Sequence, residues 1–198
     1  MAEVNEESLQ VDAKVVLVGV PDSGKAAILR QMAQRYAHDS VLTGEFAEAR
    51  VCRTGFFWPE LLPNGGRLRL ELYALSGKPL YNAADELLLE CCAGLVFVAD
   101  VREERLYEAR EALRSLVFNA GRNRFELDAM PVALHYTRTD HHPGFVPEQM
   151  DQWLGIPPGS VPRFVSGAAP GENLCEAVEW VVQKIASEVV MDEEAAVP

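Results

Sequence analysis

Residues 19–26 (GVPDSGKA) follow the pattern G-x-x-x-x-G-K-[ST] at every position except the last, which is Ala26. A continuous apolar run precedes this glycine loop over residues 14–19, as is typical of a strand buried on both faces. A helical pattern follows Lys25, and its apolar face consists of Ile28, Leu29, Met32, Ala33 and Tyr36. This order of strand, glycine loop and helix is the context that the pattern requires.

A loop of this kind cradles phosphate groups. Its backbone N–H groups and its lysine, here Lys25, bind the phosphates of a nucleotide, and the helix N-terminus adds partial positive charge. The residue that closes the pattern normally supplies a hydroxyl to Mg²⁺, and Ala26 has no oxygen to offer. We therefore predict a nucleotide site that lacks one metal ligand, formed by Gly19, Asp22, Ser23, Gly24, Lys25 and Ala26.

Strand and helix patterns alternate along the rest of the chain. Strands are predicted over residues 67–73, 93–100, 131–137 and 161–166, and helices over residues 79–92, 103–120, 146–154 and 171–190. Residues 38–66 are rich in turn residues and are expected to be irregular, except for a strand near 51–58 that forms a hairpin with 67–73. The alternation predicts a three-layer α/β fold, with a mostly parallel central sheet and helices on both faces.

Domain boundaries and partner classes follow from length and charge. Residues 1–13 are expected to form a tail or edge strand, residues 14–190 a single domain, and residues 191–198 an acidic tail. A net charge of −12 disfavours nucleic acid and anionic membranes as partners. No apolar run approaches the ~20 residues that a membrane crossing needs. The four cysteines lack C-x-x-C spacing, so we expect a cytoplasmic protein.

The order of these motifs resembles the Ras-like small GTPases, and within them the bacterial MglA family, over residues 12–190. Residues 53–59 (RTGFFWP) are similar to the first switch region, and residues 72–81 (LYALSGKPLY) to the second. Residues 137–140 (TRTD) stand where the guanine-reading motif N-K-x-D belongs. The resemblance implies a G domain that binds GTP or GDP and acts as a switch in polarity, motility or signalling. It also implies a protein partner of the roadblock type.

The resemblance assigns roles around the phosphates. Thr54 would close over Mg²⁺ and the γ-phosphate, and the backbone N–H of Gly77 would donate to the same phosphate. Arg53 would act as an internal arginine finger that neutralises charge during phosphoryl transfer. As an alternative, Arg53 is a solvated loop residue.

The resemblance assigns a second group of residues to the base. Asp140 would accept hydrogen bonds from guanine N1–H and N2–H, which adenine cannot match. Thr137 and Arg138 replace the usual Asn and Lys beside it. The backbone contact behind the base would come from Ser166, Gly167 and Ala168.

Departures from the family pattern affect each part of the chemistry. Ala26 removes a Mg²⁺ ligand, and Ala74 stands where most Ras-like proteins have Asp and the MglA family has Thr. Lys78 replaces the Gln that orients the attacking water, and it either supplies charge in place of Mg²⁺ or points to solvent. These changes predict weak or absent Mg²⁺ binding and a pseudo-GTPase or nucleotide-locked switch, with some retained turnover as the alternative.

Two other functions stay open on the sequence alone. One is a nucleotide-free scaffold with this fold, and the other is a P-loop NTPase or kinase that acts on a small substrate. The second would need a recognisable catalytic acid or substrate lid, and the sequence does not offer one. A zinc site is disfavoured, because no second ligand pair accompanies His135, Asp140, His141 and His142. The aromatic residues Phe56, Phe57 and Trp58 either form a docking surface or cover the sheet.

Overall fold

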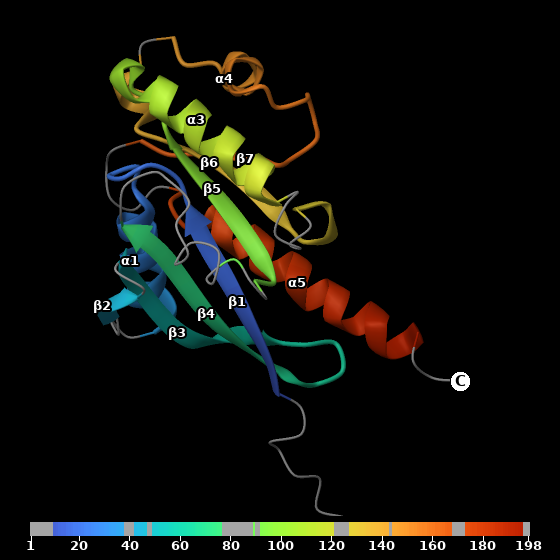
Figure 1. Cartoon of the computed structure of the whole chain (residues 1–198). Coiled ribbons are helices and arrows are strands. Elements are labelled where there is room, and N and C mark those ends of the chain that lie inside the picture. Colours follow the sequence, from blue (N-terminus) through green and yellow to red (C-terminus); the bar gives the residue numbers. More distant parts are fainter. Residues whose placement is uncertain are drawn as a thin grey trace, which may run out of the picture.

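The computed structural model describes residues 10–37, 42–46, 49–76, 89, 92–120, 127–142, 144–167 and 173–195. Within these ranges one seven-stranded sheet has the order β2-β3-β4-β1-β5-β6-β7 (Figure 1). The strands are β1 (Gln10–Val18), β2 (Leu42–Phe46), β3 (Ala49–Leu61), β4 (Arg67–Ser76), β5 (Gly94–Asp100), β6 (Val132–Thr137) and β7 (Arg163–Val165). Strands β4, β1, β5, β6 and β7 run parallel, whereas β2 and β3 form antiparallel pairs.

Helices cover both faces of this sheet. They are α1 (Lys25–Tyr36), α3 (Glu103–Ala120), α4 (Pro147–Leu154) and α5 (Glu176–Ala195), with short 3₁₀ turns at Leu127–Ala129 and Thr139–His141. A hydrophobic core lies on each face of the sheet. Strand β1 contributes side chains to both cores, because successive strand side chains point to opposite faces. Val15 and Leu17 pack with α1 and α5, whereas Val16 and Val18 lie in the second core with α3 and α4. The predicted three-layer, mostly parallel α/β fold is confirmed.

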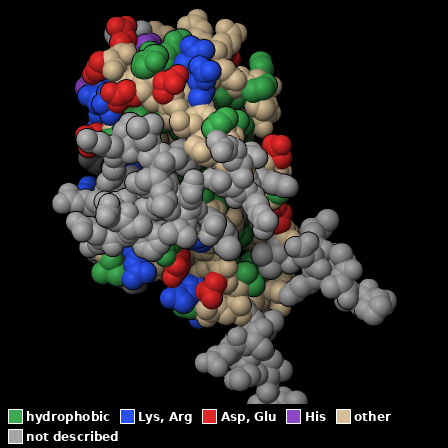
Figure 2. All heavy atoms as spheres, viewed as in Figure 1, with side chains coloured by type: hydrophobic (Ala, Val, Ile, Leu, Met, Phe, Trp, Pro, Cys, Tyr) green, Lys and Arg blue, Asp and Glu red, His purple; other side chains and the backbone are tan. Residues whose placement is uncertain are grey.

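The outer face of α3 carries ion pairs as well as the exposed hydrophobic side chains of Tyr107, Val117 and Phe118. Figure 2 shows side chains of both charges interspersed over the part of the molecule that α3 and α4 cover. Ion pairs of (i, i+3) spacing join Arg105 to Glu108 at 2.9 Å and Arg114 to Glu111 at 3.6 Å. None of the described helices has the length and apolar character that a membrane crossing requires.

The antiparallel edge of the sheet is more regular than the sequence suggested. Strands β2 and β3 occupy most of the region expected to be irregular, and β3 is 13 residues long. The predicted hairpin of β3 with β4 is present, with Gly65 in a left-handed turn at φ +83°. Phe56 and Trp58 are buried on one face of β3, whereas Phe57 on the other is 42% exposed. Side chains that alternate between buried and exposed positions stabilise a strand. This alternation explains why β3 forms although the segment contains many turn residues.

Other boundaries shift by a few residues. Strand β1 begins at Gln10, four residues before its expected start, because Gln10 to Ala13 pair with β4 from Arg67 onward. Helix α5 begins at Glu176 rather than at residue 171. The helix expected over residues 79–92 lies outside the described residues, apart from Leu89 and Cys92.

Candidate nucleotide site

The glycine loop joins β1 to α1 at the carboxyl end of the parallel strands. Gly19 has φ +140°, and a Cβ there would lie 2.2 Å from the carbonyl oxygen of Val98 in β5. Gly24 has φ +104° and precedes α1, and a Cβ there would lie 3.2 Å from Cγ2 of Thr137. Both glycines of the sequence pattern are therefore required by backbone conformation and by close approach of neighbouring strands.

Lys25 lies inside this loop and is only 4% exposed. Its ammonium donates hydrogen bonds to the carbonyl oxygens of Gly19 at 2.8 Å and Val20 at 2.5 Å, and to Oγ of Ser23 at 3.2 Å. The start of α1 has no side-chain cap and no acidic residue in its first turn. A helix N-terminus of this kind is suited to bind an anion.

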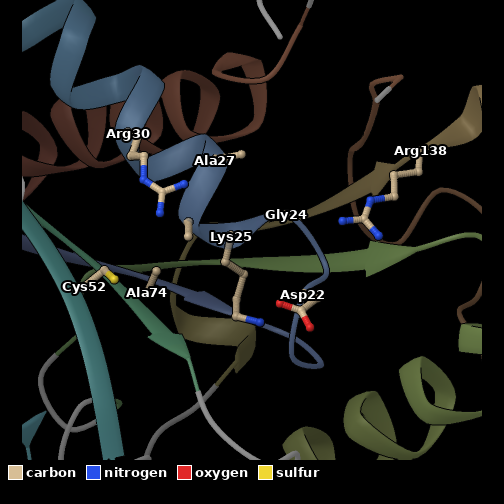
Figure 3. Close-up of a pocket in the computed structure, with 9 residues that line it drawn as sticks. Asp22, Gly24, Lys25, Ala27, Arg30, Cys52, Ala74 and Arg138 are labelled. Atoms are coloured by element: carbon tan, nitrogen blue, oxygen red, sulfur yellow. The ribbon is translucent and has the colours of Figure 1, made fainter. Parts of the chain in front are cut away.

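Two adjoining cavities open at this end of the sheet. The first, which we call the phosphate cavity, has a volume of about 220 Å³ and is drawn in Figure 3. Its lining comprises Asp22, Gly24, Lys25, Ala26, Ala27, Arg30, Cys52, Ala74 and Arg138. The second, which we call the base cavity, has a volume of about 290 Å³, and its walls include Gln31, Gln34, Thr137, Gly167 and Leu174. Gly24, Ala27, Arg30 and Arg138 line both cavities.

The predicted base residues lie together where β6 and β7 end, and Thr137, Arg138 and Gly167 among them line the base cavity. Thr137 is buried and donates its hydroxyl to the carbonyl oxygen of Ser23 at 2.7 Å, which joins the end of β6 to the glycine loop. Thr139 donates its N–H and its hydroxyl to the carbonyl oxygen of Ser166, each at 3.2 Å. A Cβ on Gly167 would lie 3.4 Å from Cγ of Asp140, whose side chain is 51% exposed. The structure therefore brings Asp140 and Gly167 side by side.

Arg138 is fixed at the junction of the two cavities. Its backbone is left-handed at φ +60°, and its guanidinium donates to Oδ2 of Asp100 at 2.9 Å. Asp100 is fully buried and also accepts from Arg102, at 2.7 Å for the shortest contact. A buried carboxylate needs such partners, because desolvation disfavours an unpaired charge. Asp100 thus holds Arg138 in place beside the glycine loop.

Ser166 also has a buried hydrogen-bond partner, His135. Nε2 of His135 lies 2.9 Å from Oγ of Ser166, and both residues are buried. Burial lowers the pKa of His135 to about 4, so the imidazole is neutral near pH 7. No group of three His, Cys, Asp or Glu side chains within the described ranges is arranged to hold a metal ion.

Several predicted site residues lie apart from the cavities or cannot be placed. Thr54 is 4% exposed in the middle of β3, opposite Leu72 of β4, and does not line either cavity. It shares a strand face with Cys52, two residues earlier, which does line the phosphate cavity. Arg53 is exposed on the opposite face of β3. Gly77, Lys78 and Ala168 lie outside the described residues.

The side chains that line the phosphate cavity do not fit Mg²⁺, the metal that the resemblance implies. Mg²⁺ requires oxygen ligands in near-octahedral geometry. The wall presents methyl groups at Ala26 and Ala74, a thiol at Cys52 and a guanidinium at Arg30, and Asp22 is the one carboxylate in the described lining. Around the position of the missing hydroxyl, the described wall therefore offers methyl groups, a thiol and a guanidinium, and none of these is an oxygen ligand.

Sequence reasoning missed Arg30, which lines both cavities. The loop pattern ends at residue 26, so it does not include Arg30. The available signal was the helical spacing, because Arg30 lies four residues after Ala26 and so occupies the same face of α1.

Comparison with known proteins agrees with this architecture. No protein-family model matches the chain. The chain is 25% identical over 195 residues to the mutual gliding-motility protein MglA of Myxococcus xanthus, and the aligned region covers 96% of this chain and 98% of that protein. Together with the fold, this similarity supports a relationship to the Ras-like small GTPases.

Proposed function

We propose that this protein is a divergent relative of MglA that binds guanine nucleotides and acts as a protein switch. The observation that carries the proposal is the continuity of the two cavities through Gly24 and Arg138. One ligand can place its phosphates on the glycine loop and its base in the base cavity, against Gly167 and the neighbouring carboxylate of Asp140. This location also agrees with the rule that ligands of open α/β sheets bind outside the carboxyl ends of the strands.

Hydrolysis is expected to be slow or absent. The hydroxyl that would hold a metal is missing at Ala26, and the residue that would orient water is replaced by Lys78. Electrostatic stabilisation and water positioning are the main contributions of this fold to phosphoryl transfer. The proposed switch therefore depends on which nucleotide is bound, or on whether one is bound, more than on turnover.

The cellular role and partner are proposed from the relative. MglA is by name a gliding-motility protein, and we extend a role in motility or polarity to this chain. The resemblance to its family makes a roadblock-type protein the first partner to test. A pull-down with such a protein, with and without GTP, checks this part separately from nucleotide binding.

Replacement of Asp140 by Asn tests the proposed base recognition. A carboxylate accepts from two guanine N–H groups, whereas an amide donates one hydrogen bond and accepts one. Xanthine has a carbonyl in place of the guanine amino group, so Asp140→Asn is expected to weaken GTP binding and strengthen XTP binding. Isothermal titration of the unchanged protein and of Asp140→Asn with GTP, XTP and ATP measures this change in base preference. Equal affinity of the unchanged protein for ATP and GTP would show that Asp140 does not read the base.

A nucleotide-free scaffold is the second candidate function. It is favoured by the contacts of Lys25, whose ammonium donates to the Gly19 and Val20 carbonyl oxygens of its own loop. Such contacts stabilise the loop when no phosphate is present. The same titration separates the two candidates, because a scaffold gives no saturable heat with any nucleotide.

A further inference from the structure

We infer that the phosphate cavity binds its anion without a divalent metal, with the Arg30 guanidinium supplying charge that Mg²⁺ would otherwise bring. The inference rests on the proposed function for the identity of the anion, a nucleotide polyphosphate. It starts from the mismatch between the described cavity wall and the ligands that Mg²⁺ needs.

The geometry of α1 places Arg30 over the missing metal ligand. Arg30 and Ala26 are four residues apart, and helical side chains lean toward the N-terminus of their helix. In Figure 3 the Arg30 side chain extends from α1 into the cavity, toward the wall that carries Cys52 and Ala74. The short side chain of Ala26 leaves room on that face. The substitution that removes the hydroxyl therefore also opens the path along which the guanidinium reaches the helix start.

Arg30 is available to a ligand. Within the described parts of the chain it has no ion pair or hydrogen bond, and its side chain is exposed. The neighbouring cation Arg138 differs, because Asp100 accepts from its guanidinium at 2.9 Å. A guanidinium that is not committed to a carboxylate can offer two parallel N–H donors to phosphate oxygens.

The charge of the cavity points to the same ligand. Three cations line it, Lys25, Arg30 and Arg138, and Asp22 is the one anion in the described lining. The whole chain has a net charge of −12, so this concentration of positive charge is local. A divalent cation placed at the wall formed by Ala26 and Ala74 would gain no ligand there and would be repelled by Arg30. A polyphosphate would gain from all three cations.

The test compares nucleotide affinity with excess Mg²⁺ and with EDTA. GTP is titrated into the unchanged protein, Arg30→Gln, Arg35→Gln, and the double variant Ala26→Thr with Arg30→Gln. Arg35→Gln is the matched control, because it removes the same charge from the same helix at a residue that pairs with Glu179 and does not line the cavity. We expect the affinity of the unchanged protein to differ by less than about twofold between the two buffers.

Arg30→Gln is expected to weaken GTP binding by about tenfold or more in both buffers, since a charged hydrogen bond is lost. Arg35→Gln should bind as the unchanged protein does. The double variant should regain affinity only in Mg²⁺, because it restores a hydroxyl and removes the competing cation. A loss of about tenfold or more in EDTA for the unchanged protein, or equal affinities for Arg30→Gln and Arg35→Gln, would overturn the inference.

Titration with inorganic pyrophosphate separates this inference from the proposed function. In one outcome GTP does not bind, whereas pyrophosphate binds in EDTA and its affinity falls on Arg30→Gln. The inference about the anion site then stands, and the guanine-binding proposal fails. If GTP binds only with Mg²⁺, the guanine-binding proposal stands and the inference fails. If neither probe binds in either buffer, both are overturned.

Discussion

The hydroxyl of Thr137 donates a hydrogen bond to the backbone carbonyl of Ser23 at 2.7 Å, across 114 residues of sequence. The same hydroxyl lies 3.3 Å from the carbonyl oxygen of Ala99. One side chain thus connects the end of β6 with the glycine loop. Thr137 therefore supplies a hydrogen-bond donor at the point where the end of β6 meets the glycine loop.

Replacement of Thr137 by Val is expected to reduce the free energy of unfolding by about 1–3 kcal/mol, because the buried carbonyl oxygen of Ser23 loses its donor. Nucleotide affinity should fall as well, since the glycine loop loses an anchor. Urea denaturation and GTP titration measure the two effects. Thr137→Ser keeps the hydroxyl and is the control. If the Thr137→Val and Thr137→Ser variants have equal free energies of unfolding, the hydrogen bond does not hold the glycine loop.

Replacement of Gly19 by Ala is expected to be severely destabilising. The new Cβ would lie 2.2 Å from a backbone oxygen of Val98, which cannot move without disturbing β5. Gly65→Ala is the matched control, because Gly65 also has positive φ but has no atom within 4 Å of the added Cβ. Strain alone should make Gly65→Ala lose about 1–3 kcal/mol, so Gly19→Ala should lose clearly more. Thermal denaturation of both variants decides whether the close approach of β5 matters.

His135 is expected to make stability depend on pH. Burial lowers its pKa to about 4, whereas an unfolded chain has a value of about 6.5. Between pH 4 and pH 6.5 the unfolded state therefore binds more protons than the folded state. The stability that neutral His135 contributes to the folded state is fully present above about pH 6.5 and is lost as the pH falls toward 4. The loss is at most about 3 kcal/mol.

His135→Gln should flatten the slope of unfolding free energy against pH between about 4 and 6.5, because the amide does not titrate and can still reach Ser166. Replacement of His141 by Gln is the matched control, because it removes an imidazole from an exposed position. Denaturant unfolding at several pH values in this window measures all three proteins. Parallel slopes for the unchanged protein and His135→Gln would show that the imidazole does not set this dependence.

Single-turnover GTP cleavage is expected to need two repairs, both made in the Arg30→Gln background so that no cation competes with Mg²⁺. Ala26→Thr restores a hydroxyl at the helix start, and Lys78→Gln restores an amide that can orient water. The gain in cleavage rate from both repairs together should therefore exceed the sum of the gains from each repair alone, which a double-mutant cycle measures. Rates near 1 s⁻¹ or faster in the unchanged protein, about those of activated GTPases, would contradict the prediction of impaired hydrolysis.

The sequence was sufficient to predict the layers of the fold and the location of the glycine loop, because apolar periodicity and a spaced glycine motif are local signals. It did not indicate β2 or the full length of β3, where turn residues such as Gly44 and Pro59 interrupt the local pattern. Tertiary pairing stabilises this segment instead, with β3 aligned against both β2 and β4.

The contacts of the candidate site were harder to predict. The hydrogen bond from Thr137 to Ser23 depends on how β6 lies relative to the glycine loop, which no local pattern specifies. The pairing of Arg138 with Asp100 likewise joins two strand ends 38 residues apart in sequence. Arg30 could have been found by extending the motif one helical turn, since it follows Ala26 at (i, i+4) spacing.

Equilibrium titration of the purified protein with GTP and ATP, in Mg²⁺ and in EDTA, tests the central claim most directly. We predict saturable binding of one GTP per chain in both buffers, with ATP bound at least about tenfold more weakly because Asp140 discriminates against adenine. The absence of saturable GTP binding in either buffer, or equal affinity for the two nucleotides, would contradict the account of this protein as a guanine-nucleotide switch.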